Sequence, residues 1–138
     1  MLDIENFKSI NASLGWAAGN ELLCAVGNRL SQRLRPPDVV ARLGGDLFCL
    51  VLDRISTRRD ATQTTERVSD FLKRPLLVAG QEVTVKARIG IVLNYPDCSD
   101  GAEMIRQAEK AARGAKSQHH SSIRLWEPPP GGSRLQTA

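Results

Sequence analysis

Apolar residues recur at helical spacing in three separate parts of the chain. The spacing predicts helices over residues 20–34, 60–73 and 100–117, each with one apolar face turned toward a core. Prolines follow the first two segments, and a proline cannot continue a helix because it lacks the backbone N–H group. Asp60 is expected to cap the second helix, since its short carboxylate can accept a hydrogen bond from a free N–H group at the helix start.

Short runs of apolar and β-branched residues lie between the predicted helices and predict strands. They cover residues 1–4, 39–43 and 47–53, a hairpin over 75–93 that turns near residue 80, and residues 122–126. The segment Gly44-Gly45-Asp46 separates the second run from the third, which is typical of a tight turn between paired strands. Residues 127–138 are rich in proline and glycine, which predicts a disordered tail.

The predicted elements follow the order β-α-β-β-α-β-β-α-β, and no internal boundary interrupts residues 1–126. Hairpins that alternate with helices predict a single α/β domain (an α+β sandwich), in which helices pack on an antiparallel sheet. A ferredoxin-like core is the natural candidate for this order. In such a sheet the first strand lies beside the hairpin of residues 39–53.

The composition is that of an ordinary soluble globular protein, with 41% hydrophobic and 25% charged residues. No apolar run approaches the ~20 residues that a membrane-spanning helix needs. Acidic residues soon after Met1 argue against a signal peptide. We therefore expect a cytoplasmic domain without a membrane partner.

Charge and cysteine content narrow the expected chemistry further. The net charge of +4 is mild and is consistent with polyanionic ligands such as nucleotides. Nucleic acid is not an expected partner, because lysines and arginines form no long run and only 4% of the residues are aromatic. The three cysteines are widely spaced, so we expect reduced thiols that pack as small apolar side chains.

Two acidic residues would meet in the predicted sheet. Asp3 ends the first strand, and Asp46 lies at the tip of the neighbouring hairpin. Two converging carboxylates suit a hard divalent cation such as Mg²⁺, with nucleotide phosphates in the other coordination positions. The alternative is that Asp46 only forms the turn, which is a common role for aspartate after glycine.

Five segments resemble the characteristic segments of one family, in the same order. Residues 2–11 resemble its DxDxFKxxN segment and residues 14–23 its LGHxxGDxxL segment. Residues 41–48, with the sequence ARLGGDLF, look like the ARLGGDEF stretch that gives the family its name. Residues 89–91 and 108–116 resemble its SIGIA strand and its ADxALYxAK helix. The chain is identified as a member of the GGDEF domains of diguanylate cyclases, which implies a nucleotidyl-cyclase-type antiparallel sheet.

The resemblance implies a metal site at the end of the first strand. Asp3 matches the first metal-binding aspartate, and the Ile4 carbonyl matches a backbone ligand. Asp46 matches the acidic residue that binds metal within the family's central motif and is expected to be catalytic. The implied cofactor is Mg²⁺ or Mn²⁺.

The resemblance also implies a site for a guanine nucleotide. Asn6 and Phe7 would present backbone N–H groups to the phosphates, and Lys8 and Lys116 would neutralise phosphate charge in catalysis. Asn11 would form a hydrogen bond with the guanine. The alternatives are solvated surface lysines, and a helix-capping role for Asn11.

The segment Arg35-Pro36-Pro37-Asp38 has the spacing of the family's RxxD inhibitory site, which binds the product cyclic di-GMP. Arginine offers a planar fork to a phosphate or to a guanine edge, and aspartate accepts hydrogen bonds from guanine N–H groups. Arg67 resembles a secondary contact in the next helix. The alternative is a salt bridge within the loop that caps the end of the helix.

Several positions depart from the family pattern around the catalytic site. Leu47 replaces the glutamate of the central motif, and a leucine can neither hold a metal nor act as a base. Asn20 replaces an aspartate that pairs with guanine, so a charge-assisted contact becomes weaker. His120 replaces an arginine that contacts phosphate, Glu5 replaces the second aspartate of the first motif, and Arg113 stands where a tyrosine is common. We expect these changes to weaken metal binding and turnover without disturbing the fold.

The chain also lacks the helix and most of the first strand with which the family domain begins. We expect this flank to be a hydrophobic patch, covered by a partner chain, by a swapped element or by nothing.

The family reaction condenses two GTP molecules into cyclic di-GMP at a dimer interface. We expect this chain to be a degenerate, catalytically impaired domain of cyclic di-GMP signalling that binds GTP and/or cyclic di-GMP as a regulatory module. A second copy of the chain or a companion signalling domain is the expected protein partner. Three alternatives stay open: an active diguanylate cyclase, a structural dimerisation module without a ligand, and an inert fragment.

Overall fold

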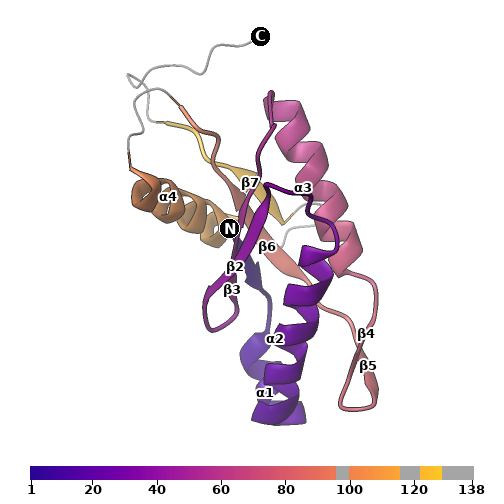
Figure 1. Cartoon of the computed structure of the whole chain (residues 1–138). Helices are drawn as coiled ribbons and strands as arrows, with labels where there is room; N and C mark the ends of the chain where they lie inside the picture. The colour runs from indigo at the N-terminus through magenta and orange to yellow at the C-terminus, as the bar shows by residue number, and fades with distance from the viewer. Residues whose placement is uncertain (96–99, 116–121, 129–138) are drawn as a thin grey trace.

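The structure, a computed structural model, describes residues 1–95, 100–115 and 122–128. Its helices are α1 (Phe7–Leu14), α2 (Trp16–Ser31), α3 (Arg58–Leu72) and α4 (Gly101–Gly114). Its strands are β1 (Leu2–Ile4), β2 (Val39–Gly44), β3 (Leu47–Val51), β4 (Leu76–Val78), β5 (Gln81–Val83), β6 (Ala87–Ile91) and β7 (Ile123–Leu125). Figure 1 shows how these elements are arranged.

Five of the strands form one sheet in the order β2-β3-β1-β6-β7. All neighbours in it are antiparallel except β6 and β7, which are parallel. The first strand is therefore central, and it lies beside the β2–β3 hairpin as the sequence predicts, with Leu2 opposite Phe48. The α/β fold expected from the order of elements is confirmed.

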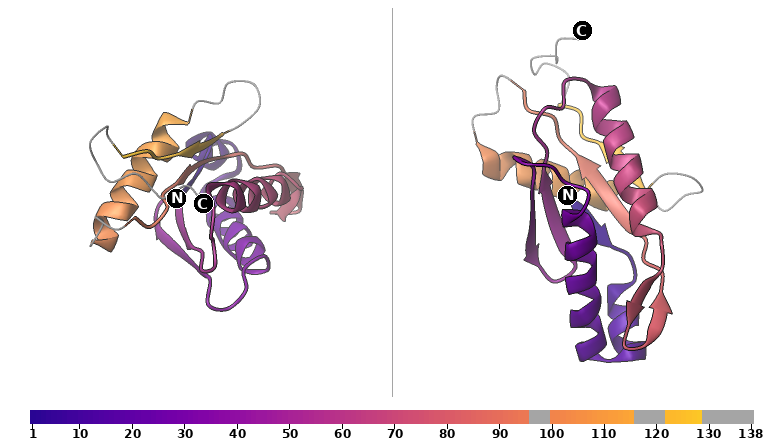
Figure 2. Two further views of the ribbon diagram at one scale, coloured as in Figure 1. Left: turned by 90° about the horizontal axis from the view of Figure 1, so that it is seen from above. Right: turned by 45° about the vertical axis from the view of Figure 1, so that its right-hand side comes forward.

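Helices cover both faces of the sheet, with α2 and α3 on one side and α4 on the other (Figure 2). The larger core lies under α2 and α3, where β1 contributes Leu2 and Ile4. Other buried members of this core are Leu22, Val26, Leu30, Phe48, Leu72 and Ile89. A smaller cluster on the opposite face joins Met1 to Ala108 and Ala112 of α4, with Leu47 and Cys49 packed against it.

The helix α4 approaches the sheet closely because β6 carries a glycine at the contact. A Cβ atom on Gly90 would lie 1.9 Å from the Ala108 carbonyl oxygen and 2.4 Å from the Ala112 nitrogen. Only a residue without a side chain fits there, since both neighbours are backbone atoms of the helix. Small residues on both elements therefore set the distance between α4 and the sheet.

The region before β2 contains two helices where the sequence predicts one. The prediction over residues 20–34 captures most of α2 but misses its first turn, and α1 is not predicted at all. No residue of α1 is fully buried, although its apolar residues recur at helical spacing. Phe7, Ile10 and Leu14 nevertheless pack against the core from that helix. Gly15 separates the two helices with a backbone φ of 88°, which favours glycine.

The hairpin predicted over residues 75–93 divides into two parts. The strands β4 and β5 form a separate two-stranded sheet, and β6 leaves this hairpin to join the main sheet. The predicted turn is correct, because Ala79 and Gly80 have positive φ values of 49° and 76°. The pairing partner of β6 depends on β1, which lies far away in the sequence, so local patterns do not indicate it.

The helix α3 begins earlier than predicted because Thr57, and not Asp60, is its N-cap. The Thr57 side chain accepts a hydrogen bond from the Asp60 N–H group at 3.1 Å, and the Asp60 carboxylate accepts one from the Thr57 N–H group at 3.1 Å. This reciprocal pair is a capping box, in which two free N–H groups are satisfied at once.

The end of the chain lies mostly outside the described residues, as do positions 129–138 of the predicted tail. Glu127, the first residue assigned to that tail, forms an ion pair with Arg58 at 3.0 Å. Within the described part of the chain, no helix has the length and apolar character to cross a membrane.

The contact at Gly90 gives a test of the packing between α4 and the sheet. We expect Gly90→Ala to lower the free energy of unfolding by at least about 2 kcal/mol, because the added methyl group meets helix backbone that cannot rotate away. Urea denaturation followed by circular dichroism measures this change.

Gly27→Ala is the matched control, since a Cβ atom there would make an ordinary contact of 3.6 Å with Phe48. Within α2 this substitution should raise stability by about 0.5–1 kcal/mol through helix propensity. Equal effects of the two alanines would contradict the close approach of α4 to the sheet.

Candidate functional site

The structure brings the two predicted carboxylates together at one end of β1. The Ile4 N–H group donates a hydrogen bond of 3.2 Å to the Asp46 carbonyl oxygen, which ties the hairpin turn to this end of the strand. Asp3 is directly opposite Leu47, the residue after Asp46. The negative charge of Asp46 acts on Asp3 and contributes to raising the pKa of its carboxyl group.

Asp3 lies in a row of three residues that crosses the centre of the sheet. In the strand register, Leu47 is opposite Asp3 on β3, and Arg88 is opposite Asp3 on β6. The Arg88 Nη2 atom donates to the Asp3 Oδ2 atom at 2.5 Å, and the two side chains are 36% and 17% exposed. The carboxylate is thus flanked by an apolar side chain on one strand and by a guanidinium group on the other.

The pKa of Asp3 reflects this half-buried position. Burial raises the pKa of the carboxyl group above its ordinary value of 3.8, the charge of Arg88 lowers it, and the charge of Asp46 raises it again. The net direction is upward, so burial outweighs the ion pair. The positive charge of Arg113 on α4 also acts on Asp3, and Arg113 itself forms an ion pair with Glu109.

The helix α1 begins three residues after Ile4. Asn6 precedes it in the left-handed conformation, with a φ of 59°, and has no side-chain capping bond. The N–H groups of the first helical turn have no partner within a helix, and they form its electropositive end. Lys8 is exposed in this turn, so the segment that the sequence predicts to meet phosphates presents N–H groups and a positive charge.

The contact between α1 and α2 contains a buried polar atom without a partner. Asn11 Oδ1 is buried and accepts no hydrogen bond from any described residue. It lies against Gly19, where a Cβ atom would come within 1.7 Å of this oxygen. Asn20, predicted to contact the base, follows Gly19 and is exposed. Asn11 and Asn20 therefore lie on two adjacent helices.

Asp38 of the RxxD segment stabilises its own loop. Its carboxylate accepts hydrogen bonds from the N–H group of Asp53 at 2.8 Å and from that of Arg35 at 3.4 Å. The Arg35 side chain is exposed and forms no ion pair with a described carboxylate, so the alternative of a salt bridge within the loop is not seen. Arg67 on α3 donates to Gln63 and Thr64 of its own helix, both at 3.3 Å.

Two predicted site residues, Lys116 and His120, lie outside the described residues. Arg88 is a site residue that the sequence analysis misses. Within the strand it stands between two buried residues, Ala87 and Ile89, so alternation places it on the opposite face of the sheet. Its pairing with Asp3 depends on a register across 85 residues of sequence, which local patterns do not reveal.

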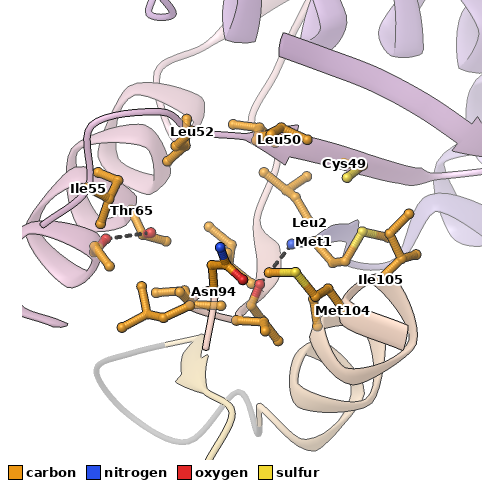
Figure 3. Close-up of a pocket in the computed structure, with 18 of the residues that line it drawn as sticks. Met1, Leu2, Cys49, Leu50, Leu52, Ile55, Thr65, Asn94, Met104 and Ile105 are labelled. Carbon is orange, nitrogen blue, oxygen red and sulfur yellow. Dashed lines mark hydrogen bonds between the residues drawn. The ribbon is translucent and has the colours of Figure 1, made fainter. Parts of the chain in front are cut away.

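A separate cavity of about 620 Å³ lies between β3 and β6, beyond Met1 (Figure 3). Its lining is mostly apolar and comes from both helical layers, with Val68 of α3 and Met104 and Ile105 of α4 among the contributors. Met1 and Leu2 are among the residues that line it. Asp3, Asp46 and Arg88 are not part of its lining, so it is distinct from the polar site.

Comparisons with known proteins decide the family. The family model described as "Diguanylate cyclase, GGDEF domain" matches residues 1–122. The chain belongs to the GGDEF family. It is 36% identical over 128 residues to the diguanylate cyclase TpbB of Pseudomonas aeruginosa, which covers 91% of this chain and 29% of TpbB. It is 34% identical over 116 residues to the cyclic di-GMP phosphodiesterase NbdA of the same species, covering 84% of this chain and 15% of NbdA.

Solved GGDEF structures share the fold. The GGDEF domain of TpbB (YfiN) superposes with a TM-score of 0.84 at 33% identity, covering 93% of this chain and 80% of that domain. An EAL/GGDEF domain protein from M. capsulatus superposes with a TM-score of 0.83 at 32% identity, covering 92% and 82% of the two chains. This chain is therefore a GGDEF domain of cyclic di-GMP signalling, and it spans under a third of the curated relatives described above.

The raised pKa of Asp3 gives a test of the electrostatics at this site. A carboxyl group whose pKa is higher in the folded state favours folding when protonated, and this contribution is lost as the pH rises above 3.8. We therefore expect the stability of the Asp3→Asn variant, relative to the unchanged chain, to increase as the pH rises from about 4 toward neutrality. Urea denaturation of both proteins across this range measures the difference. A relative stability that falls with pH would show that the pairing with Arg88 outweighs burial.

Proposed function

We propose that this GGDEF domain is a catalytically impaired regulatory module that binds guanine nucleotides, GTP and/or cyclic di-GMP, without turning GTP over. The observation that carries the proposal is Leu47, which lies beside Asp3 where the family motif has a glutamate. Its side chain packs against the apolar cluster of Met1, Ala108 and Ala112. A residue held there supplies neither a metal ligand nor a base, and loss of a general base typically costs ~10²–10⁴ in rate.

Binding of a nucleotide is supported by the groups that surround this end of β1. The first turn of α1 offers free N–H groups and Lys8 to phosphates. The unpaired Asn11 Oδ1 atom between α1 and α2 can accept from an N–H group of a guanine base. These groups bind and orient a nucleotide, and none of them has to transfer a proton.

Members of the family generally use Mg²⁺, and Asp3, the Ile4 carbonyl and Asp46 are the residues expected to hold it. The geometry does not fit a divalent cation well, because the half-buried carboxylate of Asp3 already accepts a hydrogen bond from Arg88 at 2.5 Å. The described residues also contain no group of three or more histidine, cysteine or acidic side chains arranged to hold a metal.

An active diguanylate cyclase is the second candidate, because TpbB, at 36% identity, is named as one. The two candidates differ in one measurable property, the formation of cyclic di-GMP from GTP. We also propose that the domain works together with a companion signalling domain or a second copy of the chain, because the matched relatives are much longer than this domain.

We expect no measurable cyclase activity from the chain. Leu47 removes the motif carboxylate, and Asn20 weakens the contact to guanine. Mass spectrometry of reactions with GTP and Mn²⁺ measures the product. Formation of cyclic di-GMP at roughly 1 s⁻¹ or above, a rate typical of enzymes, would support the second candidate instead.

We expect the Leu47→Glu variant to remain below full activity in the same assay. Catalytic groups that act together are not additive, and Asn20 and His120 remain unchanged in this variant. Leu47→Gln is the matched control, since it adds polarity without a charge. Full activity of the glutamate variant would show that the other departures have little effect.

We expect cyclic di-GMP to bind through Arg35 and Asp38, more tightly than GTP binds at the site beside β1. Arg35 is exposed and its loop is held by Asp38, so little order has to be gained on binding. Arg35→Ala should remove a charge-assisted contact worth about 1.5–3 kcal/mol, a ten- to hundredfold loss of affinity. Isothermal titration calorimetry with cyclic di-GMP measures it.

Arg59→Ala is the control for this experiment, because Arg59 is also exposed and forms no ion pair or side-chain hydrogen bond among the described residues. Both substitutions should leave the melting temperature nearly unchanged. Absence of binding at high micromolar cyclic di-GMP, or binding unaffected by Arg35→Ala, would exclude this site.

A further inference from the structure

We propose that Arg88 is the resident cation of the site beside β1: its guanidinium group holds Asp3 in place of a divalent metal and contacts the phosphates of a bound nucleotide. The inference rests on the proposed nucleotide binding, and it names Arg88 as a residue that recognises the phosphates. It predicts a GGDEF domain whose nucleotide affinity is independent of Mg²⁺. The residues that carry it are Asp3, Arg88 and their neighbours in the sheet.

The position of Arg88 is fixed by the sheet. The ladder between β1 and β6 sets Leu2 opposite Ile89, Asp3 opposite Arg88 and Ile4 opposite Ala87. On the other face Leu2, Ile4 and Ile89 are buried in the main core, so a shift of this register would expose all three. Arg88 is therefore held as the direct cross-strand neighbour of Asp3.

The ion pair competes with a metal for the same carboxylate. The donor and acceptor are 2.5 Å apart, and a hydrogen bond between two charged groups is stronger than one between neutral groups. A divalent cation on Asp3 would lie a few ångströms from the guanidinium charge, where two positive charges repel each other strongly in a half-buried site. Leu47, the other neighbour of Asp3, offers no oxygen in compensation.

Arg88 keeps unused donors that suit a phosphate. A guanidinium group carries five N–H donors and always keeps its charge. The bond to Asp3 uses Nη2, and the buried Nε atom has no partner among the described residues. The side chain is 36% exposed, so it is partly open to solvent beside Asp3. A polyphosphate that lies across the end of β1 meets a fixed positive charge without a metal.

The first experiment uses Mn²⁺ alone, detected by electron paramagnetic resonance, with no nucleotide present. We expect the unchanged chain to leave Mn²⁺ free at millimolar concentration. Arg88→Gln should bind Mn²⁺ at least tenfold more tightly, because Asp3 is then released and can hold the metal together with Asp46. The double variant Arg88→Gln with Asp3→Asn should bind Mn²⁺ no more tightly than the unchanged chain. Arg113→Gln is the matched control, since Arg113 acts on Asp3 only at longer range and should change little.

Binding of Mn²⁺ to the unchanged chain with the affinity of Arg88→Gln would overturn the proposal, and so would absence of binding to both. Thermal unfolding of each variant checks that it is folded. If Arg88→Gln does not fold, the unchanged chain and Asp3→Asn are compared instead. Mn²⁺ binding by the unchanged chain that is lost in Asp3→Asn would show that Asp3 holds a metal despite Arg88, and would overturn the proposal.

The second experiment measures GTP affinity by calorimetry in EDTA and in Mg²⁺. We expect equal affinities for the unchanged chain, within about twofold. Arg88→Gln should lose about ten- to hundredfold in EDTA and recover part of this loss in Mn²⁺. A requirement for metal in the unchanged chain would overturn the proposal. If the chain binds no GTP, the proposed function fails, whereas the Mn²⁺ experiment still decides the role of Arg88.

Discussion

The structure depends on the insertion of a three-residue strand, β1, between β3 and β6. Leu2 and Ile4 are almost fully buried on the face that α2 and α3 cover, and they fix the register with both neighbouring strands. Slippage by one residue would place Asp3 in that core and expose both apolar side chains. Burial of two large aliphatic side chains contributes roughly 3–6 kcal/mol, so the register is strongly selected.

The same alternation determines the chemistry of the site. Since Leu2 and Ile4 face one layer, Asp3 faces the other, together with its cross-strand neighbours Leu47 and Arg88. The carboxylate lies between an apolar residue and a cation, and burial still raises its pKa. A site of this kind is suited to hold an anionic ligand through fixed positive groups, whereas it lacks the neighbouring carboxylate that the family motif provides. In the proposed function, Leu47 and Arg88 beside Asp3 favour binding of a nucleotide over its turnover.

Two other regions are arranged independently of this site. Asp38 anchors the loop after α2 to the segment that follows β3 through the Asp53 N–H group, and the Arg35 side chain is exposed. The apolar cavity lies between β3 and β6, and Met1 is part of its lining. The RxxD loop is joined to the turn that carries Asp46 by β2 along the sequence, and by the hydrogen bond between Asp38 and Asp53 to the segment that follows β3.

The sequence by itself determined the family, the hairpin of β2 and β3 and three of the helices, because apolar periodicity and turn residues are local properties. It also placed Asp3 beside Asp46, since a hairpin next to the first strand leaves few arrangements. The eight-residue helix α1 was not predicted, although its apolar residues have helical spacing. The strand β6 was assigned to the wrong hairpin because its partner lies at the start of the chain. Only the tertiary structure decided that Arg88 pairs with Asp3, because a strand register across 85 residues depends on the packing of both faces of the sheet.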